Sequence, residues 1–330
     1  MQTRKLGWTD LNLTTIGYGS WALGGGDWLW SWGPQDDQAS VATILRAMEL
    51  GVNWIDTAPV YGLGHSEEVV GIALKKLPRR PILATKCSLV WDSIKKVSAR
   101  LKKESVRTEI NASLRRLGVD EIDLYQMHWP NPDEDIEEGW SAMADLVKEG
   151  KVRYIGASNF SVEQLKRIQP IHRIASLQPP YSMLKRDIES DLLGYCAANQ
   201  IGVVVYSPIQ KGLLTGKFQD RLGHLTTDDH RLNDPDFQDP RLKVHLELVE
   251  QLRPIAAKHG KSVAQLAIAW VLLRLEVTSA IVGARQPSQI EETVVAGEWV
   301  LTEEDNQLLD KLLAEHDHAL PEDLTVGGKG

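Results

Sequence analysis

The sequence predicts an α/β fold, a single (β/α)8 barrel over residues 1–330, and two observations support this prediction. Short apolar runs alternate with segments whose apolar residues recur at helical spacing, and the chain contains eight such runs. The runs are continuously apolar, as in VVVY and AIVGA, which is typical of parallel strands covered by helices on one side and by core on the other. The eight predicted strands span residues 14–20, 53–58, 81–86, 122–128, 152–158, 175–180, 202–208 and 279–284.

Local signals place helices between these strands. Residues 105–117 carry apolar residues on one face, and Gly118 follows as a residue that can end a helix. Ser161 and Gln164 have the spacing of a capping box at a helix start. Residues 263–273 are apolar around the whole circumference, which indicates a well-buried helix.

Three segments fall outside the strand–helix alternation. Residues 209–240 follow the seventh strand and contain Pro, Asp and Gly, so we expect a long functional loop. Residues 241–259 and 302–315 have helical spacing and predict two extra helices. An open, doubly wound sheet is the alternative fold, but residues 17–22 (GYGSWA) lack the third glycine of a G-x-G-x-x-G dinucleotide motif.

Composition excludes several classes of protein. Hydrophobic residues make up 42% and charged residues 25%, which is globular composition, and no apolar run is long enough to span a bilayer. The formal charge of −8 argues against nucleic-acid and anionic-membrane partners. The two cysteines provide neither a disulfide framework nor a four-thiolate zinc site, and we expect no metal. The N-terminus has no signal-peptide core, so we expect a cytoplasmic protein.

Polar residues stand at the carboxyl ends of the predicted strands. In a parallel barrel these ends meet on one face, where barrel enzymes place their active sites. The residues at these positions are Asp56, Lys86, His128, Ser158, Gln178, Tyr206 and Gly283.

Asp56, Tyr61, Lys86 and His128 have the chemistry of a tuned general acid. A phenol has a pKa of about 10, and a neighbouring ammonium lowers it. Lys86 could supply that ammonium, Asp56 could hold Lys86 in place, and His128 could orient a substrate oxygen. From the residues alone, a structural Asp–Lys ion pair with a core histidine and a loop tyrosine stays open as the alternative.

Seven motifs, in order along nearly the whole chain, resemble the aldo-keto reductase family. They are NWIDTAPVYGLGHS (53–66), ATK (84–86), YQMHW (125–129), GASNF (156–160), LQPPYS (177–182), YSPIQKGLLTGK (206–217) and IVGARQPSQIEE (281–292). The sequence is most similar to the bacterial group that contains inositol-catabolism and general-stress reductases. The resemblance implies a barrel that binds NADP(H) without a dinucleotide motif, and the tetrad Asp56, Tyr61, Lys86 and His128 with Tyr61 as proton donor.

The resemblance also implies a set of cofactor contacts. At the nicotinamide end, Tyr206 would stack on the ring, with Ser20, Trp21, Ser158, Asn159 and Gln178 around it. The implied pyrophosphate contacts are Ser207, Pro208, Ile209, Gln210, Gly212 and Lys217. The implied adenosine contacts are Gly283, Arg285, Gln289 and Glu292, and Arg231 in the long loop would clamp the cofactor.

Two features concern specificity. Thr293 stands where the family often has an Asn that contacts adenine, and an NADPH preference would depend on Arg285. The tryptophans Trp21, Trp91 and Trp129 would wall an apolar substrate pocket, with loop packing as the alternative.

We therefore expect an NADPH-dependent reductase of small aldehydes and ketones. Two alternatives stay open. The first is an NADP(H)-binding sensor or regulatory subunit with little turnover, as in the related potassium-channel β-subunits. The second is a barrel aldolase that uses Lys86 as a Schiff base.

Overall fold

Eight parallel strands close into a barrel, and this confirms the predicted fold class. The computed structural model describes residues 1–219 and 225–321. The barrel closes because β3 pairs with β4 on one side and with β12 on the other, so an open sheet is excluded. Each predicted run overlaps one strand of the barrel. The barrel strands are β3 (Ile16–Gly19), β4 (Trp54–Asp56), β5 (Ile82–Cys87), β8 (Ile122–Met127), β9 (Val152–Ser158), β10 (Ser176–Gln178), β11 (Gly202–Val205) and β12 (Val277–Gly283).

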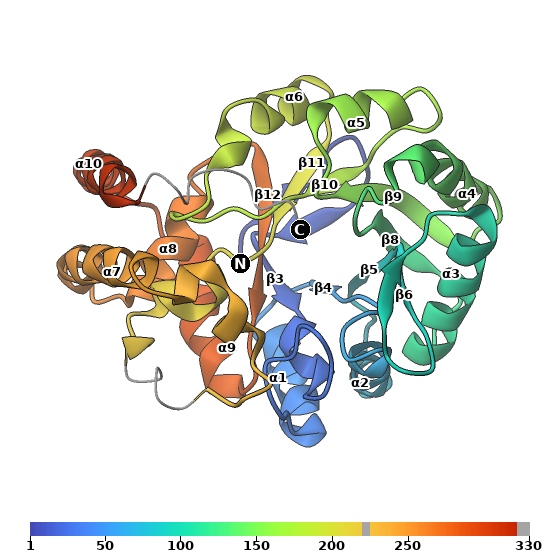
Figure 1. The fold of residues 1–330 in the computed structure, drawn as a ribbon, viewed down its shortest axis with the longest axis horizontal. Helices are drawn as coiled ribbons and strands as arrows, with labels where there is room; N and C mark the ends of the chain where they lie inside the picture. The colour runs from blue at the N-terminus through green and yellow to red at the C-terminus, as the bar shows by residue number, and fades with distance from the viewer. Residues whose placement is uncertain (220–224, 322–330) are drawn as a thin grey trace.

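A ring of helices surrounds the barrel, with one helix after each strand (Figure 1). Apolar side chains between strands and helices form the larger part of the core. The ring consists of α1 (Asp37–Glu49), α2 (His65–Leu74), α3 (Lys103–Leu117), α4 (Ile136–Lys148), α5 (Val162–Ile168), α6 (Leu192–Ala198), α8 (Val263–Val271) and α9 (Pro287–Val294).

The helix boundaries follow the local signals in the sequence. α3 ends at Gly118, whose φ of 68° is the left-handed conformation that glycine adopts without strain. Ser161 and Gln164 form the predicted capping box of α5. All nine residues of α8 are buried, in agreement with its unbroken apolar pattern.

Several elements stand outside the barrel. The two extra helices are α7 (Arg241–Lys258) and α10 (Glu303–Ala319), as predicted, and they pack on each other. The described part of the predicted long loop contains three 3-10 helices, η4 (Gln210–Thr215), η6 (His230–Asn233) and η7 (Pro235–Phe237). Residues 220–224 of that loop lie outside the described residues.

Two antiparallel hairpins were not predicted. One pairs β1 (Thr3–Lys5) with β2 (Asn12–Thr14), and Leu11 and Leu13 from it join Trp54 and other interior residues in a second apolar cluster. The other pairs β6 (Leu89–Trp91) with β7 (Val97–Ala99) directly after β5. Among the described residues, no helix is both long and apolar enough to cross a membrane.

Candidate active site

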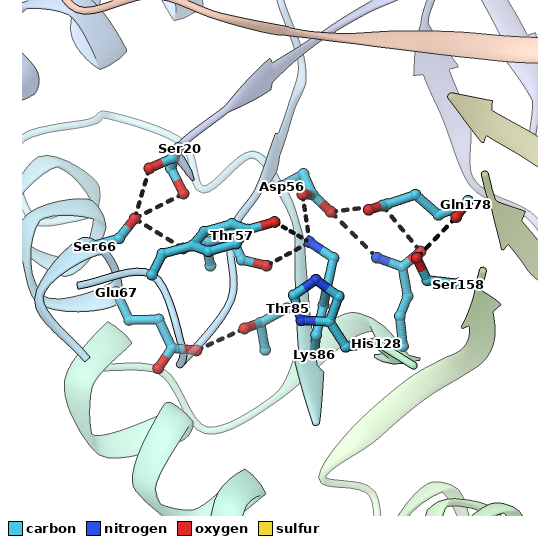
Figure 2. A network of polar contacts seen from close by, with 12 residues as sticks. Ser20, Asp56, Thr57, Ser66, Glu67, Thr85, Lys86, His128, Ser158 and Gln178 are labelled. Carbon is cyan, nitrogen blue, oxygen red and sulfur yellow. Dashed lines mark hydrogen bonds and ion pairs between the residues drawn. The ribbon is translucent and has the colours of Figure 1, made fainter. Parts of the chain in front are cut away.

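The ends of three barrel strands bring the predicted tetrad together. Asp56 is the last residue of β4, Lys86 lies near the end of β5, and His128 follows β8. Tyr61 comes from the loop between β4 and α2. Figure 2 shows Lys86 reaching toward Asp56, with His128 beside it.

Lys86 is the centre of the polar network. Its Nζ atom donates hydrogen bonds to Asp56 Oδ1 at 2.6 Å, to the Thr57 carbonyl at 3.0 Å and to the Tyr61 hydroxyl at 3.3 Å. The side chain has no exposed surface. An ammonium has three hydrogens, and three acceptors surround this one, so the geometry does not favour a free amine that could form a Schiff base.

Asp56 is held from two further sides. Its Oδ2 atom accepts hydrogen bonds from Gln178 Nε2 at 2.9 Å and from Gln126 Nε2 at 3.2 Å. Sequence reasoning missed Gln126. Its position two residues before His128 in the same predicted strand was the available signal, because alternate residues of a strand share a face.

Tyr61 and His128 are half-buried and pack against each other. Their ring centroids lie 5.8 Å apart, edge to face. Burial raises the pKa of Tyr61 well above 10.0, and the Asp56 carboxylate adds to the rise. The expected lowering by Lys86 is therefore wrong as a net effect, because the loss of hydration outweighs one ammonium. Burial also lowers the pKa of His128 well below 6.5, with Lys86 as a second cause.

The predicted nicotinamide contacts are also brought together. Ser158 Oγ donates to the Gln178 carbonyl at 2.8 Å, and Asn159 Nδ2 donates to the carbonyl of His128 at 2.9 Å. Tyr206 closes the group, since its hydroxyl donates to Asn159 Oδ1 at 2.9 Å. The hydroxyl of Ser158, the amide of Asn159 and the phenol of Tyr206 thus line one side of the tetrad.

On the other side, Ser20 and Trp21 follow β3. The Ser66 hydroxyl, at the start of α2, donates to the Ser20 carbonyl at 2.9 Å. The Trp21 ring stacks on Tyr61 with centroids 6.2 Å apart, and His230 stacks on Trp21 at 5.0 Å. His230 was not predicted, because it comes from the distant loop after β11.

The predicted pyrophosphate segment begins directly after β11. Ser207 has a φ of 56°, and Pro208 and Ile209 lead into η4. Gln210 Nε2 donates to Asp236 at 2.9 Å. Gly212 has a φ of 100°, a conformation strained for any residue with a Cβ.

The predicted phosphate-binding cations already have protein partners. Lys217 Nζ lies 2.8 Å from Glu292 Oε2. The Arg231 guanidinium binds Asp229 and donates to the Lys211 carbonyl at 3.2 Å, so its observed role is to shape the long loop. The part of Arg231 as a cofactor clamp stays a prediction.

Arg285 connects the end of β12 to the tryptophan-rich loop after β3. Its Nε atom donates to Gln35 at 2.6 Å, and its other nitrogens donate to the carbonyls of Trp32 and Pro34. Its backbone N–H donates to Gln289 Oε1 at 2.7 Å, directly after Gly283 and Ala284. A cofactor 2′-phosphate that bound to Arg285 would replace the hydrogen bonds by which Arg285 holds this loop in place.

Thr293 and the predicted substrate tryptophans occupy different surroundings. The Thr293 hydroxyl donates to the Gln289 carbonyl at 2.9 Å within α9. Trp129 packs on the same apolar cluster as Tyr61, and its backbone N–H donates to Ser88 Oγ at 3.1 Å. Trp91 lies on β6, where the Arg116 guanidinium stands 5.9 Å from its ring centroid.

The comparisons with known proteins agree with this geometry. The model of the aldo/keto reductase family matches residues 15–314. The chain belongs to the aldo/keto reductase family. It is 39% identical to aldo-keto reductase YhdN of Bacillus subtilis (strain 168), over 95% of this chain and 94% of the relative. It is 38% identical to the NADH-specific methylglyoxal reductase of Escherichia coli (strain K12), over 94% of this chain and 98% of the relative.

A solved structure shows the same fold. The glycerol dehydrogenase AKR11B4 from Gluconobacter oxydans superposes with a TM-score of 0.87 at 39% identity, with 99% of each chain covered. This aldo/keto reductase is therefore an oxidoreductase that reduces small carbonyl compounds with a nicotinamide cofactor.

The residues fit such a cofactor at its ring end. The amides and hydroxyls of Ser158, Asn159 and Gln178 can pair with a carboxamide, which both donates and accepts hydrogen bonds. Two buried polar atoms nearby, Trp32 Nε1 and His230 Nε2, have no hydrogen-bond partner among the described residues. At the phosphate end, Lys217 and Arg285 would have to leave their present protein partners in order to bind phosphate groups.

Proposed function

We propose that this aldo/keto reductase reduces aldehydes and ketones to alcohols with NADPH as the hydride source and Tyr61 as the proton donor. The observation that carries the proposal is the chain from the buried Asp56–Lys86 pair to the half-buried Tyr61, with contacts of 2.6 Å and 3.3 Å at the carboxyl end of the barrel. Such a chain holds a phenol and an ammonium where a carbonyl oxygen can receive a proton.

Tyr61 keeps its proton until the carbonyl oxygen becomes basic. The raised pKa of Tyr61 means that the phenol is neutral in the pocket. As negative charge develops on the substrate oxygen, the proton moves from the Tyr61 hydroxyl to that oxygen. The Lys86 ammonium then faces the phenolate that remains and stabilises it.

His128 and the amide group have positioning roles in this proposal. The lowered pKa of His128 keeps its imidazole neutral, so it can donate one hydrogen bond to the carbonyl oxygen without competing for the proton. A bound nicotinamide supplies the hydride. Ser158, Asn159 and Gln178 would hold its carboxamide, and Tyr206 would lie against its ring, which fixes the ring relative to Tyr61.

The choice of NADPH over NADH depends on Arg285. A guanidinium is planar and permanently charged, which suits a phosphate monoester. The adjacent Gln289 side chain, bound to the Arg285 backbone, fixes the start of α9 beside it. The relative from Escherichia coli is named as NADH-specific, so the two cofactors must be compared directly.

Steady-state oxidation of NADPH and NADH with a panel of aldehydes and ketones tests the function. We expect turnover with several substrates, and a higher kcat/KM for NADPH. Tight NADPH binding without turnover across the panel would support the sensor alternative instead. Turnover with a preference for NADH would agree with the proposed reductase activity but would contradict the proposed binding of a 2′-phosphate by Arg285.

A further inference from the structure

Behind the tetrad, one buried acid connects the first turn of α2 to the strand that carries Lys86. The Glu67 side chain has no exposed surface, and its Oε1 atom accepts a hydrogen bond from Thr85 Oγ1 at 2.6 Å. Thr85 directly precedes Lys86 in β5, and Figure 2 shows this contact beside the tetrad. Successive side chains of a strand point to opposite faces, so Glu67 reaches β5 from the side of the helices, while Lys86 points to the tetrad.

The other oxygen of Glu67 binds a cation from α3. Its Oε2 atom accepts a hydrogen bond from Arg116 Nε at 2.7 Å. Both oxygens therefore act as acceptors, which is the arrangement of an ionised carboxylate. Thr85 and Arg116 bind different oxygens, so the acid separates the guanidinium from β5. An ion pair that only joined α2 to α3 would not require this additional partner on the strand of Lys86.

The residue before Glu67 holds the loop that carries Tyr61. The backbone N–H of Ser66 donates to the Tyr61 carbonyl at 3.1 Å, and the Ser66 hydroxyl lies 3.2 Å from Thr57 Oγ1. The Thr57 carbonyl in turn accepts a hydrogen bond from Lys86 Nζ. Two adjacent residues of one helical turn thus bind the catalytic loop and the catalytic strand.

Lys86 depends on nearby negative charge to remain an ammonium. Burial lowers the pKa of Lys86 from 10.5, and the Asp56 and Glu67 carboxylates oppose this lowering. Tyr61 and His128 also face the ammonium. Burial keeps both of them neutral, because it raises the pKa of Tyr61 well above 10.0 and lowers the pKa of His128 well below 6.5.

Two further titratable groups face Glu67 besides its partner Arg116. Glu109 approaches from α3, and burial raises its pKa to about 7, so it is ionised before the alkaline range is reached. Tyr125 approaches from β8, and burial raises its pKa well above 10.0. Neither group therefore replaces Glu67 as a charge that changes near the pKa of Lys86.

We propose that Glu67 is a positioning residue of carbonyl reduction, which acts on Lys86 through the hydrogen bond from Thr85 and through its own buried negative charge. The inference rests on the proposed function, in which the Lys86 ammonium stabilises the phenolate of Tyr61. An ion pair between two outer helices then controls the protonation of a group in the active site.

The pH at which kcat/KM for hexanal falls to half at the alkaline end, called the alkaline midpoint here, reports the loss of the Lys86 proton. Glu67→Gln removes the negative charge and keeps an oxygen that can accept from Thr85. We expect this variant to lower the alkaline midpoint by at least about 0.5 pH unit, because an opposite charge that favoured the ammonium is lost. Glu67→Asp keeps the charge and should restore most of this shift.

Arg116→Gln breaks the same ion pair from its other side. The Glu67 carboxylate stays in this variant, so we expect an alkaline midpoint at or above that of the wild type. A purely structural ion pair would give the same effect whichever partner is replaced. If Glu67→Gln does not fold, as judged by circular dichroism, Arg116→Gln still decides the question, because a lowered alkaline midpoint in it would overturn the proposal.

Glu68→Gln is the matched control. Glu68 is the next residue of α2 and loses the same charge, but its side chain is 61% exposed. Solvent and salt screen such a charge, so the alkaline midpoint should stay within about 0.2 pH unit of the wild type.

Two results would overturn the positioning role of Glu67 while hexanal reduction by the wild type upholds the proposed function. One is an alkaline midpoint in Glu67→Gln that equals that of the wild type or lies above 10.5, the ordinary pKa of a lysine. The other is an equal lowering in Glu67→Gln and Arg116→Gln. Absence of hexanal reduction by the wild type at every pH with either cofactor would overturn the proposed function itself.

Discussion

The protonation state of each tetrad side chain decides what the site can do near neutral pH. Tyr61 is neutral because burial, with Asp56, raises its pKa well above 10.0. His128 is neutral because burial, with Lys86, lowers its pKa well below 6.5. A site with a neutral acid and a neutral imidazole can protonate a carbonyl oxygen without first losing or gaining a proton.

The pH profile of aldehyde reduction tests these states. We expect kcat/KM at saturating cofactor to show no inflection from His128 or Tyr61 between pH 6.5 and pH 10.0, the ordinary pKa values of imidazole and phenol. Burial lowers the pKa of Lys86 from 10.5, so an inflection at the alkaline end belongs to this ammonium. A lowered pKa for His128 leaves it uncharged throughout this range, and a raised pKa for Tyr61 leaves it protonated. An inflection near pH 6.5 that disappears in His128→Gln would show that His128 titrates, contrary to this expectation.

At the scale of single elements, α3 supports the end of β5 through one buried acid. Glu109 accepts a hydrogen bond from the backbone N–H of Ser88 at 2.9 Å and another from Ser105 Oγ at 3.0 Å. Ser88 Oγ in turn accepts a hydrogen bond from the backbone N–H of Trp129, directly after His128. Burial is the main cause that raises the pKa of Glu109 from 4.5 to about 7.

This pKa makes stability depend on pH in a defined direction. Because the pKa of Glu109 is raised in the folded state, its protonated form contributes to the free energy of unfolding. This contribution is complete below pH 4.5 and is lost as the pH rises to about 7. We expect wild-type stability to fall by about 3 kcal/mol relative to Glu109→Gln over this range. Urea unfolding of the wild type and of Glu109→Gln at several pH values measures this fall. A difference in unfolding free energy that does not vary with pH would contradict the raised pKa of Glu109.

Elements with strong local signals were predicted from the sequence, and elements without them were missed. α3 and α5 carry a terminal glycine and a capping box, which act within a few residues. The hairpin of β6 and β7 was missed because each of its strands has only three residues and pairs only with the other.

For the whole molecule, barrel closure depends on tight packing inside the sheet. Trp54 is fully buried in the interior, and its Nε1 atom donates to Ser279 Oγ at 3.1 Å. A Cβ atom on Gly17 of β3 would lie 2.1 Å from the Trp54 ring. Strand β3 therefore requires a residue without a side chain at position 17.

Two glycine replacements test this packing against a control. Gly17→Ala should destabilise the protein by about 1–3 kcal/mol or more, because the indole cannot move away within a close-packed interior. Gly194→Ala on the exposed side of α6 meets nothing within 4 Å and should stabilise by up to about 1 kcal/mol. Thermal unfolding measures both, and equal melting temperatures for the two variants would contradict this account of the interior.

Long-range contacts account for what the sequence could not predict at this scale. Asp56, Lys86 and His128 were predicted to lie together because each stands at the end of a predicted strand, and the barrel brings strand ends together. The place of Tyr61 in the tetrad came from the resemblance to the family. The link from Arg285 to Gln35 joins residues 250 positions apart, and His230 reaches Trp21 from a separate loop. Neither pairing has a local signal in the sequence. The sequence therefore did not indicate that Arg285, an expected contact of the cofactor, is already bound to Gln35.

The most direct test of the central claim is Tyr61→Phe, with cofactor binding and aldehyde reduction measured on the same protein. The ring and its packing on Trp21 are retained, and only the hydroxyl beside Lys86 is removed. We predict NADPH affinity close to that of the wild type and a loss in the rate of reduction of at least about 100-fold, the scale of losing a general acid. Reduction at the wild-type rate would contradict the assignment of Tyr61 as the proton donor.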